Sequence, residues 1–589
     1  MPKRIFSFAF ATNATDECES GTGVWAWEFK NMANDEETFR GEDIDDFFAT
    51  IWDEPDNLEL FAHGLKFYSY FIFDFLLRNS FKYVPDQGSA EDLTFTAMAL
   101  PNGEVYSIDV YFEVKKYKNQ KKVHKVVFRD TKKLIDLPVW ELSNELHLAV
   151  PLVSDYMTAD KPNPYEPVWD EWHELDCRCD LAREVFRKAR SNHLFGNTLA
   201  SSALRMYRNE SWKRFNDNFP VLDPAVDATL REAYIGGFNY LNPKYKGEET
   251  GKGTVIDVNS MYPFILSSAS KCKLPVGEPV RFDGKYEKNP EYPLYVQRFS
   301  CMFRLRPGRI PTVRMRSYGD FDPHEYVSDS KHNIWTLTLS GPDLHLFFQN
   351  YEVYHLDFID GWMFQSRPGL FDDYVYEWIG VKNHARAEGD KITGYIAKSA
   401  LNMLGGKFAS YNSSAKLEPF IDSSDTLSFV EYKGKASDTI YLPVALFMTA
   451  YARYYLITMS RKLSEYGVKH KGFDPVIYHD TDCIASLLSE DELREIPSLR
   501  LDDFRLGAFK IESRFERARW IRQKTYCLDL GGGNIKVAAS GLPSAIVPYI
   551  TYDAFMTGFT TAKIDEALKR PLFRAVPGGA VIDHTDYTF

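Results

Sequence analysis

The sequence YHDTD at residues 478–482 is the strongest candidate for chemistry, because Asp480 and Asp482 flank a single residue. The apolar residues 475–477 precede it, and this pattern predicts a strand that runs into a β-hairpin turn. Residues two apart on a strand share a face, so the two carboxylates could coordinate a divalent metal ion together. The alternative is a surface turn, in which aspartates are common for purely structural reasons.

A second candidate is Asp257, which lies near the end of a predicted strand over residues 254–258. The chain then turns through Ser260 and Pro263. Burying an aspartate at a strand end costs free energy unless the carboxylate is paired or bound to a metal. The alternative is a helix N-cap, a position that Asp and Ser both favour.

A predicted helix carries the third candidate, the sequence KSALNMLGGKF at residues 398–408. Lys398 and Asn402 are one turn apart and share a helix face. A lysine in this position could contact a triphosphate as a point charge, and Lys382, about four turns earlier, could join it. The alternative is an ordinary solvated basic face.

These stretches follow the patterns D-x-x-S-x-Y-P, K-x-x-x-N-x-x-x-G-K and Y-x-D-T-D, and they resemble motifs A, B and C of family B DNA polymerases. Residues 234–238 (YIGGF) resemble the Y-x-G-G element between the exonuclease and polymerase domains of that family, and residues 524–526 (KTY) resemble its K-x-Y primer-strand motif. Residues 277–286, 310–312 and 576–579 extend the resemblance to phi29-like, protein-primed phage polymerases over nearly the whole chain.

The resemblance implies nucleotidyl transfer assisted by two metal ions, with roles for three sets of residues. The catalytic and metal-binding set, which would hold two Mg²⁺ or Mn²⁺ ions, comprises Asp257, the carbonyl of Val258, Asp482 and, in a supporting role, Asp480. The set expected to bind the incoming nucleotide comprises Tyr262, Lys382, Lys398, Asn402 and Gly405. The set expected to bind primer and template comprises Tyr234, Gly236, Gly237, Lys524 and Tyr526.

The implied fold is α/β and multidomain, with an RNase H-like exonuclease domain joined to a right-hand polymerase of palm, fingers and thumb. Two inserted terminal-protein-region modules are expected within the polymerase. The expected boundaries are 1–195 for the exonuclease-like domain, 196–267 and 441–535 for the palm, 268–362 for the first insertion, 363–408 for the fingers, 409–440 for the second insertion, and 536–589 for the thumb. The implied partners of this monomeric viral enzyme, in the host cytoplasm, are primer-template DNA, deoxynucleoside triphosphates and a terminal priming protein.

The chain departs from the family at its exonuclease motifs. Ala9 and Ala11 replace both acids of the first motif, Tyr68 replaces the aspartate of the second, and the third retains Asp180 but has Asp176 in place of tyrosine. A lone Asp180 cannot hold two Mg²⁺ ions, so we expect an intact exonuclease fold with little or no hydrolysis. Two alanines at both acids suggest deliberate replacement, and an engineered, exonuclease-deficient enzyme is the hypothesis.

Gly405 is a second departure, because the family places tyrosine before the Gly-Lys of motif B. Loss of that ring predicts a wider nucleotide pocket, which would fit an engineered enzyme that accepts modified nucleotides. Motif C ends in Cys483 rather than the usual serine, and the sequence offers no firm account of its effect.

Local patterns predict the elements that must position these residues. Helices are predicted over residues 43–52, 68–78, 171–192, 366–408 with a turn at 388–390, and 443–466, and strands over residues 5–11, 23–29 and 104–110, with a β-rich module of short strands over 270–360. The seven cysteines show no C-x-x-C spacing, which argues against a structural zinc and a disulfide framework and favours a reducing compartment. No long apolar run predicts a membrane span.

The net charge of −13 is unusual for a nucleic-acid-binding protein, but a basic channel can exist within an acidic chain. Three rival hypotheses therefore stay open. They are a nuclease with water in place of the primer hydroxyl, a non-catalytic DNA-binding replication protein, and a host-type polymerase without protein priming.

Overall fold

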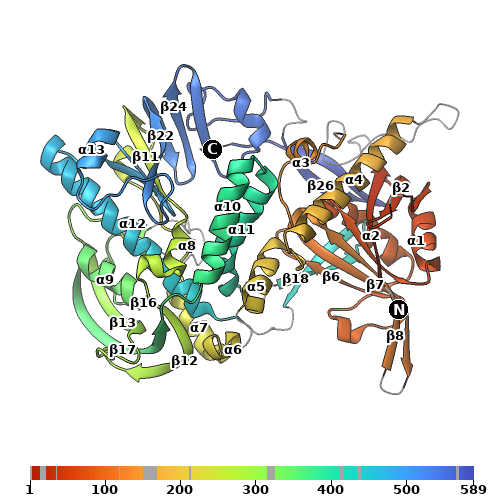
Figure 1. Ribbon diagram of the computed structural model, residues 1–589, viewed down its shortest axis with the longest axis horizontal. Coiled ribbons are helices and arrows are strands. Elements are labelled where there is room, and N and C mark those ends of the chain that lie inside the picture. The colour runs from red at the N-terminus through yellow and green to blue at the C-terminus, as the bar shows by residue number, and fades with distance from the viewer. Residues whose placement is uncertain are drawn as a thin grey trace.

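The chain folds into an N-terminal α/β unit and a larger α/β body, with a helical hairpin in the middle of the molecule between them (Figure 1). The computed structural model describes residues 3–13, 21–34, 36–117, 120–149, 169–210, 214–314, 326–410, 415–433, 440–564 and 569–588. The predicted α/β class is confirmed. None of the helices in these ranges combines the length and the apolar character that a membrane crossing requires.

The N-terminal unit is built on an eight-stranded mixed sheet in the order β3-β2-β1-β4-β8-β7-β6-β5. Its strands are β1 (Lys3–Thr12), β2 (Val24–Asn31), β3 (Thr38–Gly41), β4 (Asn57–Ala62), β5 (Lys82–Tyr83), β6 (Thr94–Ala99), β7 (Val105–Tyr117) and β8 (Gln120–Asp130). Its helices are α1 (Ile44–Asp53), α2 (Leu65–Arg78), α3 (Val139–Glu145) and α4 (Trp169–Ser191). The predicted first strand, 5–11, is confirmed within β1, most of which is buried, and a phenylalanine-rich core lies against it.

A five-stranded antiparallel sheet forms the base of the larger body, in the order β22-β11-β21-β20-β9. Its strands are β9 (Asn239–Leu241), β11 (Gly253–Val258), β20 (Val476–Asp480), β21 (Cys483–Ser486) and β22 (Phe509–Phe515). The long helix α12 (Leu442–Lys471) contacts β20 and β21 of this sheet, and it confirms the helix predicted over 443–466. Its side chains from Leu442 to Ala450 are all buried, so α12 is a central element of the largest core.

The predicted β-rich module is confirmed, but its two main strands are long rather than short. Its four-stranded sheet has the order β12-β17-β13-β16, from β12 (Leu274–Asp283), β13 (Leu294–Leu305), β16 (Trp335–Ser340) and β17 (Tyr351–Arg367). The bulges in the β13–β17 pairing let the strands continue past interruptions in the apolar pattern. Helix α9 (Gly341–Asn350) joins β16 to β17 and contacts α12, which ties the module to the larger body.

The central hairpin consists of α10 (Asp372–Glu388) and α11 (Lys391–Phe408). The predicted turn is confirmed, because Gly389 ends α10 at a φ of 75°, a conformation that glycine adopts without strain. The helical pattern predicted from residue 366 begins only at Asp372, since β17 continues to Arg367.

The remaining elements complete the body and connect it to the N-terminal unit. The hairpin β18 (Ala415–Ile421) and β19 (Leu427–Lys433) contacts α2, as does β27 (Gly579–Thr585), which pairs with β26 (Arg570–Val576). The other elements are α5 (Leu199–Glu210), α6 (Phe215–Asn218), α7 (Pro224–Ala233), β10 (Glu249–Thr250), α8 (Met261–Leu266), β14 (Val313–Arg314), β15 (Tyr326–Val327), α13 (Glu490–Glu495), β23 (Arg517–Arg522), β24 (Thr525–Gly531) and β25 (Asn534–Ala539).

Candidate functional site

Asp257 and Asp482 meet on neighbouring strands of the five-stranded sheet. Asp257 lies across from Cys483 in the β11–β21 register, and the amide of Val258 donates a 2.8 Å hydrogen bond to the carbonyl of Asp482. The predicted hairpin turn is confirmed, since Thr481 has a φ of 59° between β20 and β21. Two chain segments more than 200 residues apart therefore place two carboxylates at one edge of the sheet.

The two carboxylates are half-buried and repel each other. Burial, followed by the charges of Asp257 and Asp480, raises the pKa of Asp482 to about 7. Burial also raises the pKa of Asp257, although the ammonium of Lys510, 3.0 Å from its Oδ1, acts in the opposite direction. A divalent cation shared by the two acids would relieve this repulsion.

The donor set fits Mg²⁺ that binds together with a phosphate ligand. Within the described residues, no group of three or more His, Cys, Asp and Glu side chains is arranged as a complete metal site. Asp257 and Asp482 offer two carboxylates on neighbouring strands, and the carbonyl of Val258 stays a predicted third ligand. Mg²⁺ is commonly held by one or two carboxylates, and water and substrate phosphates complete its octahedron.

Asp480 has partners within the protein. It accepts a 3.2 Å hydrogen bond from the Tyr478 hydroxyl, and the Lys524 ammonium lies 3.3 Å from its Oδ1. The Lys524 amide also donates to the Tyr478 hydroxyl at 2.9 Å, and the Tyr526 ring lies 5.4 Å from that of Tyr478. The structure thus brings the 478–482 and 524–526 sequences together, with Asp480 in the supporting position.

The 234–237 loop packs against the catalytic turn. A Cβ added at Gly237 would lie 2.6 Å from the Thr481 Oγ1, so this glycine permits a close approach of the loop to the turn between β20 and β21. The sequence did not indicate this contact, because the two residues are distant along the chain, and the predicted template role of Gly237 stays a prediction. A Cβ at Gly236 would meet open space, and burial raises the pKa of Tyr234.

Arg453 of α12 binds the main chain of this loop, although no sequence motif indicated it. Its guanidinium donates to the Gly236 carbonyl at 2.7 Å and also to the carbonyl of Ile235. The same guanidinium also donates hydrogen bonds to both carboxylate oxygens of Asp343 on α9, at 3.0 and 2.7 Å. Asp343 in turn accepts a hydrogen bond from Ser340 at 2.7 Å, so this buried network links the β-rich module to the loop beside the catalytic turn.

Lys382 and Lys398 approach the carboxylates from the central hairpin. The Lys382 ammonium donates to the Ser260 hydroxyl at 3.0 Å, and burial, then the charges of Lys510 and Lys398, lower its pKa. Lys398 is close enough to Asp257 to lower the pKa of that carboxyl. Both lysines therefore lie near enough to Asp257 to interact with its charge, and their contact with a triphosphate stays a prediction.

Asn402, one turn beyond Lys398, instead lines a separate cavity of about 940 Å³. Tyr395 and Lys407 from α11 also line it, as do Lys132 and Lys133 from the N-terminal unit. The cavity lies between the two parts of the molecule, so α11 contributes residues both to the carboxylate site and to this interface.

Gly405 does not open an empty space. A Cβ at this position would lie 2.3 Å from the Met448 Sδ, and both residues are buried. A methionine from α12 thus occupies the volume beside this glycine, and the wider nucleotide pocket expected from the missing tyrosine stays a prediction. The sequence did not indicate this contact, since residues 405 and 448 meet through the packing of α11 against α12.

Ala9 and Ala11 are fully buried in the N-terminal unit. They pack with Trp25, Leu175 and Cys179 in a small apolar cluster between β1, β2 and α4. Tyr68 of α2 is 3% exposed, and its ring lies 5.8 and 5.2 Å from those of Phe8 and Phe10. Apolar packing thus fills the positions of the three missing acids.

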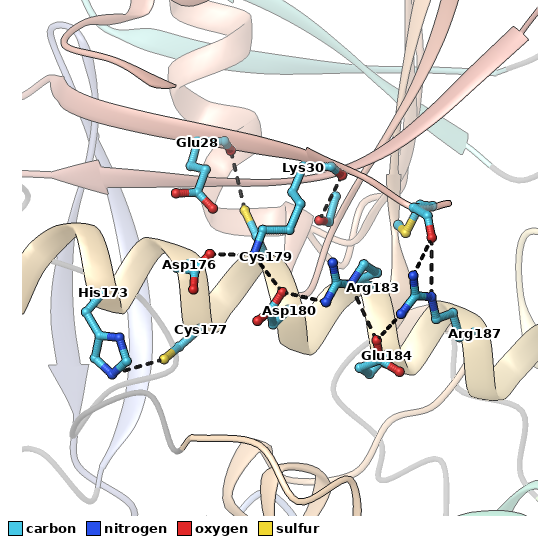
Figure 2. Close-up of polar contacts among 12 residues, drawn as sticks. Glu28, Lys30, His173, Asp176, Cys177, Cys179, Asp180, Arg183, Glu184 and Arg187 are labelled. Carbon is cyan, nitrogen blue, oxygen red and sulfur yellow. Dashed lines mark hydrogen bonds and ion pairs between the residues drawn. The ribbon is translucent and has the colours of Figure 1, made fainter. Parts of the chain in front are cut away.

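The retained acid of this region is paired with a lysine. Lys30 extends from β2 toward Asp176 and Asp180, which are one turn apart on α4 (Figure 2). Its Nζ lies 2.8 Å from Asp180 Oδ1 and also contacts Asp176, and Arg183 lies 3.0 Å from Asp180. Burial alone would lower the pKa of Lys30, but its hydrogen bonds to the two aspartates raise it.

Nearby, Glu28 is fully buried beside Arg40, whose Nε donates to Glu28 Oε2 at 2.6 Å. Burial raises the pKa of Glu28 to about 7, against the opposing effect of Arg40. Lys30 and Glu28 were not predicted as site residues, although a Lys and a Glu two apart on a strand indicate one polar face.

Comparison with known proteins agrees with this geometry. The family described as "DNA polymerase type B, organellar and viral" matches residues 180–490. The chain is 33% identical to the DNA polymerase of Bacillus phage M2, with 100% of both chains covered, and 30% identical to that of Bacillus phage phi29, with 100% of this chain and 99% of the relative covered. Its fold matches phi29 DNA polymerase in complex with primer-template DNA and incoming nucleotides, with a TM-score of 0.87, 29% identity and 100% coverage of both chains.

The match over the full length is consistent with the predicted combination of exonuclease and polymerase domains. The relatives are phage proteins. The chain therefore belongs to the type B DNA polymerases of the organellar and viral family, and it is a DNA polymerase of the phi29 type.

Proposed function

We propose that this polymerase extends a primer along a DNA template by two-metal nucleotidyl transfer at Asp257 and Asp482. The observation that carries the proposal is the pair of half-buried, mutually repelling carboxylates on β11 and just before β21, beside the lysines of α10 and α11. Bound there, Mg²⁺ or Mn²⁺ would activate the primer hydroxyl and neutralise the leaving pyrophosphate. Transfer of this kind needs positioning and charge neutralisation more than covalent chemistry.

The protein's own residues would position the reactants. Lys398 and Lys382 would steady the triphosphate, since both lie beside Asp257. Tyr262 would lie under the sugar, where its ring could reject a ribose 2′-hydroxyl by steric clash. Burial raises the pKa of Tyr262 to about 12, so its hydroxyl is uncharged at neutral pH. Lys524 and Tyr526 would hold the primer end next to Asp480.

The domain assignments belong to the same proposal. Residues 196–267 and 441–535 would form the palm, 363–408 the fingers, 536–589 the thumb, and 268–362 and 409–440 the two insertions. Known structures of phi29 DNA polymerase contain primer-template DNA, incoming nucleotides or single-stranded DNA, and we extend these ligands to this chain. We also propose protein-primed initiation, strand displacement, a monomeric state and action as a viral protein in the host cell.

Primer extension on a circular single-stranded template tests the proposal. The expected product is far longer than one circle, which would demonstrate polymerisation and strand displacement together. Asp482→Asn preserves the shape of the side chain but removes its charge, and it should abolish extension while primer-template binding in a gel-shift assay persists. Asp503→Asn, at an exposed carboxylate nearby, is the matched control and should extend normally. Extension by Asp482→Asn at the parent rate would refute the two-metal assignment.

We further propose that the N-terminal unit hydrolyses DNA slowly or not at all. The buried alanines, the buried Tyr68 ring and the Lys30 ammonium on Asp176 and Asp180 support this proposal. The surrounding residues are adapted to the missing acids, since Trp25, Leu175 and Cys179 pack against the alanines. Such coordinated packing favours divergence of the whole site over the engineered exchange of two side chains.

The test is a single strand labelled at its 5′ end and incubated with Mg²⁺ and no nucleotides. The expected result is a strand of unchanged length over a period in which the same enzyme copies a primed template completely. Stepwise shortening from the 3′ end would contradict the proposal and favour the rival hypothesis of a nuclease.

A further inference from the structure

Lys510 lies directly across the sheet from the candidate metal ligand Asp257. The two residues are partners in the antiparallel β11–β22 register, and their side chains form an ion pair of 3.0 Å. The adjacent pair Val258 and Phe509 is fully buried, so a slip of the strand that moved Lys510 away would expose apolar surface. The sheet register therefore places an ammonium group on one of the two Asp257 oxygens that a metal ion could use.

The other cations near Asp257 have different positions. Lys382 donates its hydrogen bond to Ser260, and Lys398 acts on Asp257 only through its charge. On the acidic side, Glu512 also faces this region from β22, but it pairs with Lys536 at 3.0 Å. Lys510 is thus the cation that directly occupies an Asp257 oxygen, and it is 38% exposed, which gives its long side chain room to move.

We propose that Lys510 is a placeholder cation for the metal ion at Asp257. In the metal-free enzyme its ammonium partly offsets the charge of a carboxylate that repels Asp482. An ammonium on Oδ1 competes with a metal ion for the charge of this carboxylate, and two cations so close together repel each other, so metal binding favours displacement of Lys510. This inference rests on the proposed function, because it assumes that Asp257 and Asp482 bind the metal.

The placeholder would weaken metal binding in the absence of nucleotide. A partly exposed ion pair has a modest energy, so its removal should tighten metal binding by about two- to fivefold. A triphosphate brings its own negative charge and further metal ligands, and the released ammonium of Lys510 could turn toward that charge. Lys510 would therefore make metal binding together with the nucleotide more favourable than metal binding to the nucleotide-free enzyme.

Direct titration of Mn²⁺, with free Mn²⁺ measured by its electron paramagnetic resonance signal, tests the proposal without DNA or nucleotide. Lys510→Ala should bind Mn²⁺ about two- to fivefold more tightly than the parent, whereas Lys510→Arg, which keeps the cation, should not. Lys252→Ala is the matched control, since it removes a lysine from an exposed ion pair with Glu516 beside the start of β11 and should leave the affinity unchanged within twofold. Melting curves confirm that each variant is folded.

Asp257→Asn separates failure of the inference from failure of the proposed function. If Asp257→Asn loses the Mn²⁺ site but Lys510→Ala binds no more tightly than the parent, the placeholder role is overturned and the metal site stands. If Asp257→Asn binds Mn²⁺ as the parent does, the metal assignment itself is wrong and the placeholder role fails with it. Weaker binding by Lys510→Ala would also overturn the inference, since it would make Lys510 a support of the site.

Discussion

Replacement of Arg453 tests whether the buried network behind the catalytic turn positions that turn. Arg453→Met keeps the length and much of the volume of the side chain but removes all its donors. Four hydrogen bonds are lost, two to the Asp343 carboxylate and two to the carbonyls of Ile235 and Gly236. Asp343 is left as a buried charge without its cation, which is the costly way to break a buried ion pair.

The magnitude follows from the burial of both partners. Removal of one partner from a buried ion pair costs about 3–5 kcal/mol. A polymerase body of roughly 390 residues unfolds with an entropy of about 0.8 kcal/mol per kelvin, so its melting temperature should fall by about 4–6 °C. Arg453→Lys retains a charge but not the planar fork, so its melting temperature should fall by a smaller amount.

The activity should fall as well, because the loop held by Arg453 contacts Thr481 through Gly237. A displacement of this turn by about 1 Å would slow nucleotide addition by roughly a hundredfold. Single-turnover extension of a primed template by one nucleotide measures this rate, and nucleotide titration separates it from substrate binding.

Arg461→Met provides the control, since Arg461 lies on the same helix, is half-buried and donates to Asn350 at 3.1 Å. Its melting temperature should change by less than about 1 °C. If Arg453→Met melts within 1 °C of the parent, or no lower than Arg461→Met, the network is not the support that its geometry indicates. If the melting temperature of Arg453→Met falls as expected but its folded fraction adds nucleotide at the parent rate, only the link between the network and the turn is refuted.

Two further predictions concern buried positions outside the carboxylate site. The pKa of Glu28 in the folded protein is about 7, above its ordinary value, so the folded protein loses stability as pH rises from about 4.5 to 7. Glu28→Gln lacks this titration. Its melting temperature should therefore match that of the parent at pH 5 and exceed it by about 4 °C at pH 8. Gly405→Tyr should lower the melting temperature through overpacking against Met448, by about 1–3 kcal/mol, and Met448→Ala in the same chain should restore much of the loss. Equal pH slopes for Glu28→Gln and the parent, or a Gly405→Tyr variant as stable as the parent, would contradict the respective prediction.

Local elements could be predicted from the sequence because their signals are local. The run 475–482 combines apolar β-formers with a tight acidic turn, and the Gly389 turn lies between two amphipathic stretches. The meeting of Asp257 with Asp482 was predicted only through the family resemblance, since periodicity cannot pair strands that are more than 200 residues apart. The resemblance supplied the topology, and the structure places the residues accordingly.

Side-chain packing between distant elements could not be predicted. Met448 beside Gly405, Asp343 beneath Arg453 and Lys510 across from Asp257 each depend on which residue of a second element faces the first. A motif comparison detects that a residue is missing, as it did for the tyrosine at position 405, but it does not show what occupies the vacated volume. For this reason the sequence predicted the helix that carries Gly405 but not the methionine that packs beside it.

The two acidic regions of the molecule differ in how readily their lysines can be displaced. Lys30 is 9% exposed and contacts two aspartates, one of which also pairs with Arg183, so a metal ion would have to break several buried interactions to reach Asp180. Lys510 is 38% exposed and contacts one carboxylate, while Asp482 keeps its unfavourable burial and its repulsion from Asp257. On the functions proposed above, the same ammonium–carboxylate contact would hinder metal binding at the N-terminal acids more than at Asp257. Lys30→Ala should therefore leave Asp176 and Asp180 without this cation but should not create a two-metal site. The positions of Ala9, Ala11 and Tyr68 would still lack acidic side chains.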